Sequence, residues 1–169
     1  MNTELDDKLI SILKDADVNT YPLFSLKDYI TYGKLLSNYD GDTGNILLLY
    51  KGNFMNFKVR FFGYDSCEIR QKLNDPHRDE KKKKAQDAKL KLWQLCTKLN
   101  DLKEKSHSTL VKIKCGDFDK YGRLLVTVFN INEDISDNNV TDLFKKSINY
   151  IMIKEGYGYE YYGGTKNSN

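Results

Sequence analysis

The sequence has few cysteines and histidines and no long apolar run, and each shortage excludes a class of protein. Its 169 residues include three cysteines and two histidines, at no metal-ligand spacing, so neither a disulfide framework nor a structural zinc site is expected. The longest uncharged apolar run, Ile46 to Tyr50, is far shorter than the ~20 residues of a membrane span. The acidic start of the chain lacks the basic and then apolar order of a secretory signal. We therefore expect a cytoplasmic protein without a membrane partner.

Charge and length narrow the choice further. Lysine and arginine together number 27 against 24 acidic residues, and the net charge of +3 permits a polyanionic partner without requiring one. Only four of the 27 are arginine, and two of these, Arg60 and Arg123, lie in the motifs described below. A chain of this length corresponds to one domain, and 40% hydrophobic residues suffice for a core of its own.

Hydrophobic periodicity predicts five strands, three before a helix and two after it. The predicted strands are Ile30 to Tyr39, Asn45 to Lys51, Met55 to Tyr64, Thr109 to Cys115 and Leu124 to Asn130. Apolar residues at helical spacing, from Ala85 to Leu102, predict a helix of about five turns, preceded by the lysine run 81–84. Such a run is typical of a solvated face. Five strands divided in this way suit a closed barrel of the OB kind, which removes exposed sheet edges.

Further helices are predicted on either side of the strands. A capping-box pattern and helical spacing predict a short amphipathic helix over residues 3–16, in an extension with a packing role. A second helix of the domain is predicted over Leu143 to Glu155, ending at Gly156. The expected class is α+β, mainly β: a five-stranded OB-fold barrel with two helices and a short helical N-terminal extension. The expected boundaries are 1–29 for the extension, 30–166 for the domain and 167–169 for the tail.

Four carboxylates follow the first and third predicted strands: Asp40, Asp42, Asp65 and Glu68. Because these two strands of a meander run in the same direction, both turns should lie at the same end of the sheet. Acids gathered there repel one another unless a cation lies between them, and all-oxygen ligation selects Ca²⁺ or Mg²⁺. Taken alone, however, an Asp-Gly-Asp turn is ordinary surface chemistry, and its spacing does not match an EF-hand.

Two arginines strengthen the interpretation of the acids as a site. Arg60 lies five residues before Asp65, and Arg123 follows a Tyr-Gly step at the start of the fifth predicted strand. A metal site flanked by two guanidinium groups describes a phosphodiester pocket, because both neutralise charge that develops on the phosphoryl oxygens. The alternative is two structural arginine–carboxylate pairs.

At these residues the chain resembles the staphylococcal nuclease-like, or thermonuclease, family. The segments YDGDT (39–43), VRFFGYDSCE (59–68) and DKYGR (119–123) are similar to its three signature segments, and residues 149–166 resemble its last helix and tyrosine-bearing tail. Order and spacing are preserved over residues 30–166. One signature position departs, because Cys67 stands where the family usually has proline.

The resemblance implies an OB-fold nuclease that needs Ca²⁺ and hydrolyses the phosphodiester bonds of DNA and RNA with low specificity, leaving 3′-phosphate ends. By motif, Asp42, Asp65 and the backbone carbonyl of Ser66 would be metal ligands, and Asp40 would lie in the outer part of the metal site. Glu68 would be the general base or the group that orients water.

The resemblance also implies the groups that hold the substrate. Arg60 would clamp the phosphate, and Arg123 would stabilise the transition state and the leaving group. The residues expected to contact the terminal phosphate and stack on bases are Lys120, Tyr121 and Tyr162. We expect a monomer that prefers single-stranded or loosened DNA and RNA, since aromatic faces stack on unpaired bases.

Two other functions remain open from the sequence. The first is a catalytically weak or inactive module of the same fold that binds nucleic acid or protein. The second is a structural OB protein with a fortuitous acid cluster. Nuclease activity that is lost on addition of a chelator would separate the first interpretation from both of these.

Overall fold

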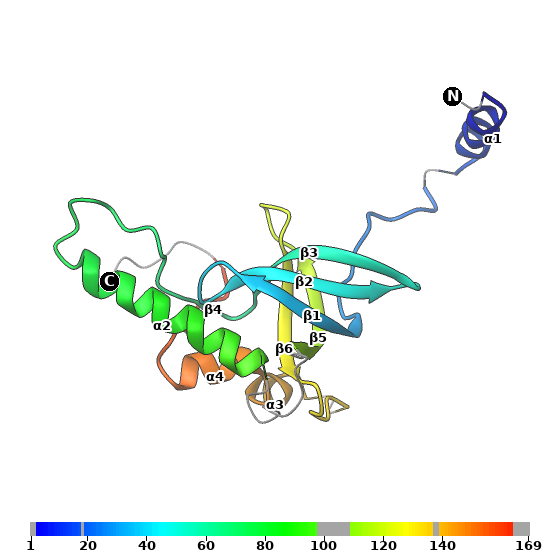
Figure 1. Cartoon of the computed structure of the whole chain (residues 1–169). Helices are drawn as coiled ribbons and strands as arrows, with labels where there is room; N and C mark the ends of the chain where they lie inside the picture. Colours follow the sequence, from blue (N-terminus) through cyan, green and yellow to red (C-terminus); the bar gives the residue numbers. More distant parts are fainter. Residues whose placement is uncertain (1–2, 18, 98–108, 137–138, 164–169) are drawn as a thin grey trace.

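A closed five-stranded barrel forms the centre of the computed structural model, which describes residues 3–17, 19–97, 109–136 and 139–163 (Figure 1). Its strands are β1 (Ile30–Asn38), β2 (Thr43–Tyr50), β3 (Asn53–Phe61), β5 (Leu110–Phe118) and β6 (Leu124–Asn130). Around the barrel the order is β1-β2-β3-β6-β5, with β1 also pairing with β5 and with β3 parallel to β6. The predicted mixed class and the closed barrel of five strands are confirmed.

Sequence features explain how the strands pack so closely. At Gly33 in β1, a Cβ atom would lie 2.6 Å from the Ile113 side chain and 2.8 Å from those of Ile46 and Leu48. Only glycine therefore lets these core side chains pack directly against the backbone of the strand. The two-residue turn between β2 and β3 has positive φ at Lys51 and at Gly52, as a tight hairpin of primed type requires. The buried positions of the barrel strands are apolar except for Asn38 at the end of β1, and most of them alternate along each strand.

Three helices gather on one side of the barrel (Figure 1): α2 (Arg78–Cys96), α3 (Val140–Lys145) and α4 (Ile148–Lys154). The buried strip of α2, which faces β1 and α4, consists of Ala85, Ala88, Leu92 and Cys96. The helix begins at Arg78, earlier than predicted, so the lysine run 81–84 belongs to it. The last predicted helical positions, Leu99 and Leu102, lie outside the described residues.

The single helix predicted over Leu143 to Glu155 is wrong, because this segment forms the two helices α3 and α4. The helical conformation is interrupted at Ser147. The backbone of this residue is extended, and its Oγ accepts a hydrogen bond from the Tyr150 amide at 3.0 Å. Serine is a preferred N-cap, so it begins a new helix here instead of continuing the first. The described residues therefore contain four helices, where three were predicted, extension included.

The N-terminal extension contains the predicted helix, α1 (Thr3–Lys14), which lies apart from the barrel (Figure 1). Its apolar side chains are exposed, Leu13 at 74%, so the expected packing role is not seen for this helix. The extension contacts the barrel after this helix: the Phe24 ring packs edge-on against the Tyr50 ring, and Leu26 is buried in the core. In the described part of the chain, none of the helices is both long and apolar enough to cross a membrane.

A buried amide ties α4 to the barrel. The Asn149 side chain accepts a hydrogen bond from the Val128 amide and donates to the carbonyls of Phe62 and Val126, each at 2.9 Å. Asn149 is fully buried, so each of these bonds is made away from water. The bonds join α4, β6 and the segment after β3, which leads directly into the acidic turn described below.

Asn149→Ala is expected to lower the free energy of unfolding by about 3 kcal/mol, because buried backbone groups lose their partners at about 1–3 kcal/mol each. The exposed Asn56→Ala in β3 is the matched control and should change stability by less than about 0.5 kcal/mol. Urea denaturation of both variants measures the difference. Equal losses would contradict the role assigned to Asn149.

Candidate active site

The turn after β1 and the short strand β4 (Tyr64–Asp65) meet at one end of the barrel. The Ser66 amide donates to Asp42 Oδ2 at 2.9 Å, and the Tyr64 hydroxyl donates to the Gly41 carbonyl at 2.6 Å. A Cβ atom at Gly41 would lie 2.7 Å from the Ala88 Cβ of α2, so only glycine allows this close approach. The two acidic turns are thus brought together as the common direction of β1 and β3 predicts.

Arg60 of β3 bridges two buried carboxylates. Its Nη1 lies 3.2 Å from Asp42 Oδ1, and its Nη2 donates to Asp65 Oδ1 at 2.8 Å. The same Nη2 also donates to the Tyr64 carbonyl at 3.3 Å. The side chains of Asp42 and Asp65 are 5% and 3% exposed, so water screens these contacts little. One guanidinium therefore holds both acids in place.

This one cation does not fully compensate the acids. Burial raises the pKa of Asp42 to about 7, although Arg60 lowers it, and the neighbouring Asp40 and Asp65 raise it further. Burial lowers the pKa of Arg60, but the same carboxylates raise it overall, so the guanidinium stays charged. The site thus carries a surplus of negative charge in a poorly hydrated place, which favours a further cation.

Asp40 shapes the turn. Its Oδ1 accepts hydrogen bonds from the amides of Asp42 and Thr43, at 3.1 and 2.9 Å, and from the Thr43 hydroxyl at 2.6 Å. This pattern presents the Asp42 side chain toward Arg60. Sequence reasoning missed Thr43, although its place after the Asp-Gly-Asp turn was a usable signal.

A polar cavity of about 540 Å³ opens beside the acids. The structure brings nearly all of the predicted site residues to its walls: Asp40, Asp42, Arg60, Asp65, Ser66, Glu68, Lys120, Tyr121 and Arg123. Glu68 reaches the wall from an irregular segment after β4. Three arginines, a group of carboxylates and three tyrosines therefore line one space, and Arg70 is the arginine among them that sequence reasoning missed.

Arg123 is held in the wall by a partner that sequence reasoning missed. Its Nε donates to Asp119 Oδ2 at 2.7 Å, while Asp119 Oδ1 accepts from the amides of Tyr121 and Arg123. Although burial raises it, these hydrogen bonds lower the pKa of Asp119 overall, so the partner stays charged. The guanidinium also lies 5.3 Å from the centre of the exposed Tyr121 ring. The separation of four residues between Asp119 and Arg123 was the available signal.

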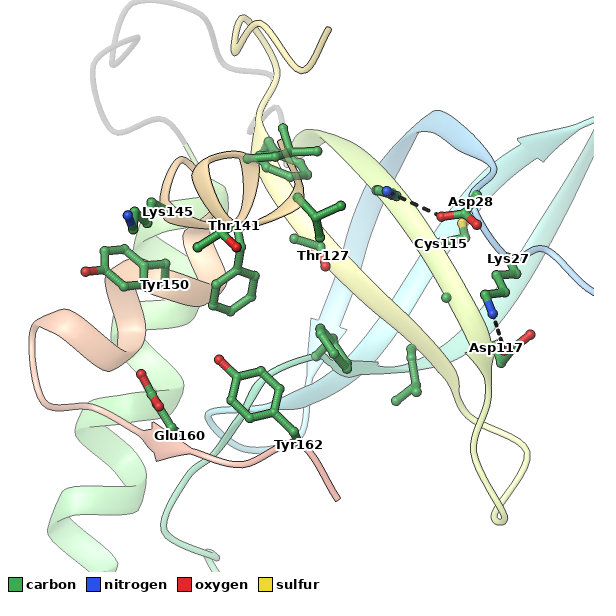
Figure 2. Close-up of a pocket in the computed structure, with 18 residues that line it drawn as sticks. Lys27, Asp28, Cys115, Asp117, Thr127, Thr141, Lys145, Tyr150, Glu160 and Tyr162 are labelled. Atoms are coloured by element: carbon green, nitrogen blue, oxygen red, sulfur yellow. Dashed lines mark ion pairs between the residues drawn. The ribbon is translucent and has the colours of Figure 1, made fainter. Parts of the chain in front are cut away.

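Tyr162 is the one predicted site residue that the structure places elsewhere. It lines a second, mainly apolar cavity of about 640 Å³, together with Glu160 and Tyr150 (Figure 2). The neighbouring Tyr161 lines the polar cavity instead, and its ring centre is 5.7 Å from the Arg60 guanidinium. Sequence reasoning also missed Tyr159, whose hydroxyl donates to Asp65 Oδ2 at 2.6 Å.

The donor chemistry of the site fits a hard cation such as Ca²⁺. Its donors are oxygens only, and the Ser66 hydroxyl, beside Asp42, is buried without a hydrogen-bond partner in the described part of the chain. Residues 3–17, 19–97, 109–136 and 139–163 contain no group of three or more His, Cys, Asp or Glu side chains spaced to hold a metal. Instead the Arg60 guanidinium lies between the two carboxylates that would be the protein's charged ligands.

Comparison of the chain with models of protein families and with curated proteins found no match in either case.

Asp42→Asn is expected to stabilise the metal-free protein at neutral pH. Because the folded pKa of about 7 exceeds the usual 3.8, the native state of the wild type loses stability as the pH rises from about 4 to 7. Asparagine does not ionise, it can still accept from the Ser66 amide, and Arg60 keeps Asp65 as its partner.

The measurement is thermal unfolding of both proteins in EGTA between pH 4.5 and 8. The midpoint of Asp42→Asn should rise relative to wild type as the pH increases. The exposed Asp117→Asn is the control, and its difference from wild type should stay constant. A constant difference for Asp42→Asn as well would show that burial does not raise this pKa.

Proposed function

We propose that this chain is a Ca²⁺-dependent nuclease of low specificity, which hydrolyses phosphodiester bonds of DNA and RNA and leaves 3′-phosphate ends. The observation that supports this best is the cavity of about 540 Å³, where Arg60 and Arg123 face the carboxylates. Guanidinium forks match the geometry of phosphate, and an acid cluster recruits the metal ion that phosphodiester hydrolysis uses. The three segments that resemble the thermonuclease family supply these same residues, and we assign the closed barrel to the OB type on the same grounds.

The proposed metal ligands are the carboxylates of Asp42 and Asp65 with the backbone carbonyl of Ser66, and Asp40 supports them through the turn. Bound Ca²⁺ would supply a Lewis acid that polarises a phosphoryl oxygen. The surplus negative charge around Asp42 supports this assignment, because a cation lowers the electrostatic cost of keeping that carboxylate ionised.

The proposed reaction is the attack of water on the phosphorus atom. Glu68, in the cavity wall, takes the proton from this water as general base. The bond from phosphorus to the 5′ oxygen breaks, the released 5′ oxygen takes a proton from water, and the phosphate stays on the 3′ side. Arg60 neutralises the equatorial oxygens and Arg123 the leaving oxygen, since preorganised donors act where charge develops. Asp119 keeps Arg123 oriented for this role through Nε.

The aromatic lining supports a preference for unpaired strands. Tyr39, Tyr121 and Tyr161 line the cavity, and Tyr121 is 71% exposed. Base–aromatic stacking contributes about 1–3 kcal/mol per base and needs a base that has left its duplex. Lys120, also in the wall, supplies a point charge for a terminal phosphate. The proposed partners are therefore single-stranded or loosened DNA and RNA, bound by a monomer.

One observation favours a second candidate, a module that binds nucleic acid without efficient cleavage. Both terminal nitrogens of Arg60 are engaged by Asp42 and Asp65, which is the closed ion-pair arrangement of a structural arginine. In an active enzyme this guanidinium must also reach the substrate phosphate. Activity and binding measured on the same preparation separate the two candidates.

Cleavage of single-stranded DNA, heat-loosened DNA and RNA is expected in Ca²⁺, and little in Mg²⁺, which demands stricter octahedral geometry. The measurement is gel-based cleavage with end analysis, which should find 3′-phosphates. Excess EGTA should abolish cleavage while leaving the fold intact. Undiminished cleavage in EGTA would refute the proposal, and binding without cleavage would favour the second candidate.

Arg60→Lys and Arg123→Lys are each expected to lower kcat about 10²–10³-fold while the fold is kept, because lysine supplies charge without the planar fork. The control is Arg78→Lys, at the start of α2 and outside the cavity, which should cleave like wild type. Steady-state kinetics and circular dichroism measure the two properties. Near-full rates in both site variants would show that neither arginine acts on the phosphate.

A further inference from the structure

One hydroxyl of the C-terminal segment 157–163, that of Tyr159, contacts the buried carboxylate of Asp65. Strand β7 (Tyr159–Glu160) pairs antiparallel with β4, with Tyr159 opposite Asp65. The Tyr159 hydroxyl donates to Asp65 Oδ2 at 2.6 Å, while Arg60 donates to Oδ1 of the same carboxylate at 2.8 Å. A distance of 2.6 Å is typical of a strong, charge-assisted O–H···O⁻ bond.

The tail is fixed on both sides of Tyr159. Before it, the amides of Tyr157 and Gly158 donate to the Met152 carbonyl at the end of α4. A Cβ atom at Gly158 would lie 2.5 Å from the Tyr64 ring, so glycine is required for this approach. After it, the Tyr161 amide donates to the Gly63 carbonyl at 3.0 Å. Backbone hydrogen bonds before and after Tyr159 therefore fix the segment that carries this hydroxyl.

We propose that Tyr159 is a positioning residue that fixes the orientation of the Asp65 carboxylate. Rotation of this carboxylate would break both of its charge-assisted hydrogen bonds, one to Tyr159 and one to Arg60. A carboxylate oxygen that accepts one hydrogen bond can also ligate a cation, because it has two lone pairs. The inference rests on the proposed function in one respect, that Asp65 is a Ca²⁺ ligand. Groups that orient metal ligands typically change affinity 10–100-fold when removed.

The exposed fractions of Tyr159 and Asp65 distinguish a positioning role of Tyr159 from a merely structural one. Tyr159 is 50% exposed, whereas Asp65 is 2% exposed. Because much of the tyrosine ring stays in water, it contributes little to the core, and its hydroxyl is the part that touches a buried group. Loss of the hydroxyl should therefore alter the properties of Asp65 more than the stability of the fold.

The test is Tyr159→Phe in the full chain. Calorimetric titration with CaCl₂ should show 10–100-fold weaker binding, while the unfolding midpoint in EGTA falls only as far as the loss of one hydrogen bond to a charged group requires. Nuclease activity should fall at limiting Ca²⁺ and return to the wild-type kcat at saturating Ca²⁺. Tyr157→Phe, which removes a hydroxyl two residues earlier in the same tail, is the control and should bind CaCl₂ like wild type.

The outcomes distinguish this inference from the proposed function. Unchanged Ca²⁺ affinity in Tyr159→Phe overturns the positioning role of Tyr159. The same conclusion follows if the variant has a lower unfolding midpoint and excess Ca²⁺ does not restore its activity. If the wild type itself binds no Ca²⁺, the proposed function fails. The ¹⁵N NMR signals of the Arg60 guanidinium then test whether Tyr159 positions Asp65. Faster guanidinium rotation in Tyr159→Phe then supports the positioning of Asp65, and identical signals overturn it.

Discussion

The contact of one guanidinium with two buried carboxylates holds this end of the molecule together. Arg60 joins Asp42, in the turn after β1, to Asp65, in β4, and the Ser66 amide and the Tyr159 hydroxyl bind the same two carboxylates. Removal of Arg60 would leave both buried carboxylates without this cation, and an uncompensated buried charge costs about 3–5 kcal/mol. A hydrogen-bonded neutral pair would be cheaper to bury. The ionic version is the one that suits the proposed site, where Arg60 would also contact a phosphate.

The barrel topology brings the second arginine to the first. Because β3 and β6 pair in parallel, with Val59 opposite Leu124 and Arg60 opposite Leu125, the residues just before β6 lie beside the part of β3 that contains Arg60. Arg123 is among them, at the end of a loop that Asp119 organises through its two amide contacts and one ion pair. The closed strand order therefore converts two motifs 63 positions apart in the chain into facing walls of one cavity.

Alternating hydrophobicity predicted the five strands to within a few residues, because each strand buries one face in a closed barrel. It did not predict the break between α3 and α4, where the Ser147 cap outweighs a continuous apolar pattern. Nor did it identify which tail tyrosine enters the polar cavity. Successive side chains of an extended tail point to opposite sides, so a shift of one position exchanges Tyr161 for Tyr162. The raised pKa of Asp42 depends on burial and on three charged neighbours, which no linear pattern contains.

The site is electrostatically unfavourable in a way that suits its proposed role. Asp40, Asp42 and Asp65 share one permanent cation, and burial already raises the pKa of Asp42 to about 7. A sequence optimised only for stability would replace one of these acids with a neutral residue, since local conflicts of this kind are disfavoured unless function requires them. Three separate groups instead contact the acids and orient them: Arg60, the Ser66 amide and the Tyr159 hydroxyl. Groups from three parts of the chain thus surround these acids, and a negative centre of this kind is what the proposed metal-dependent phosphodiester pocket needs.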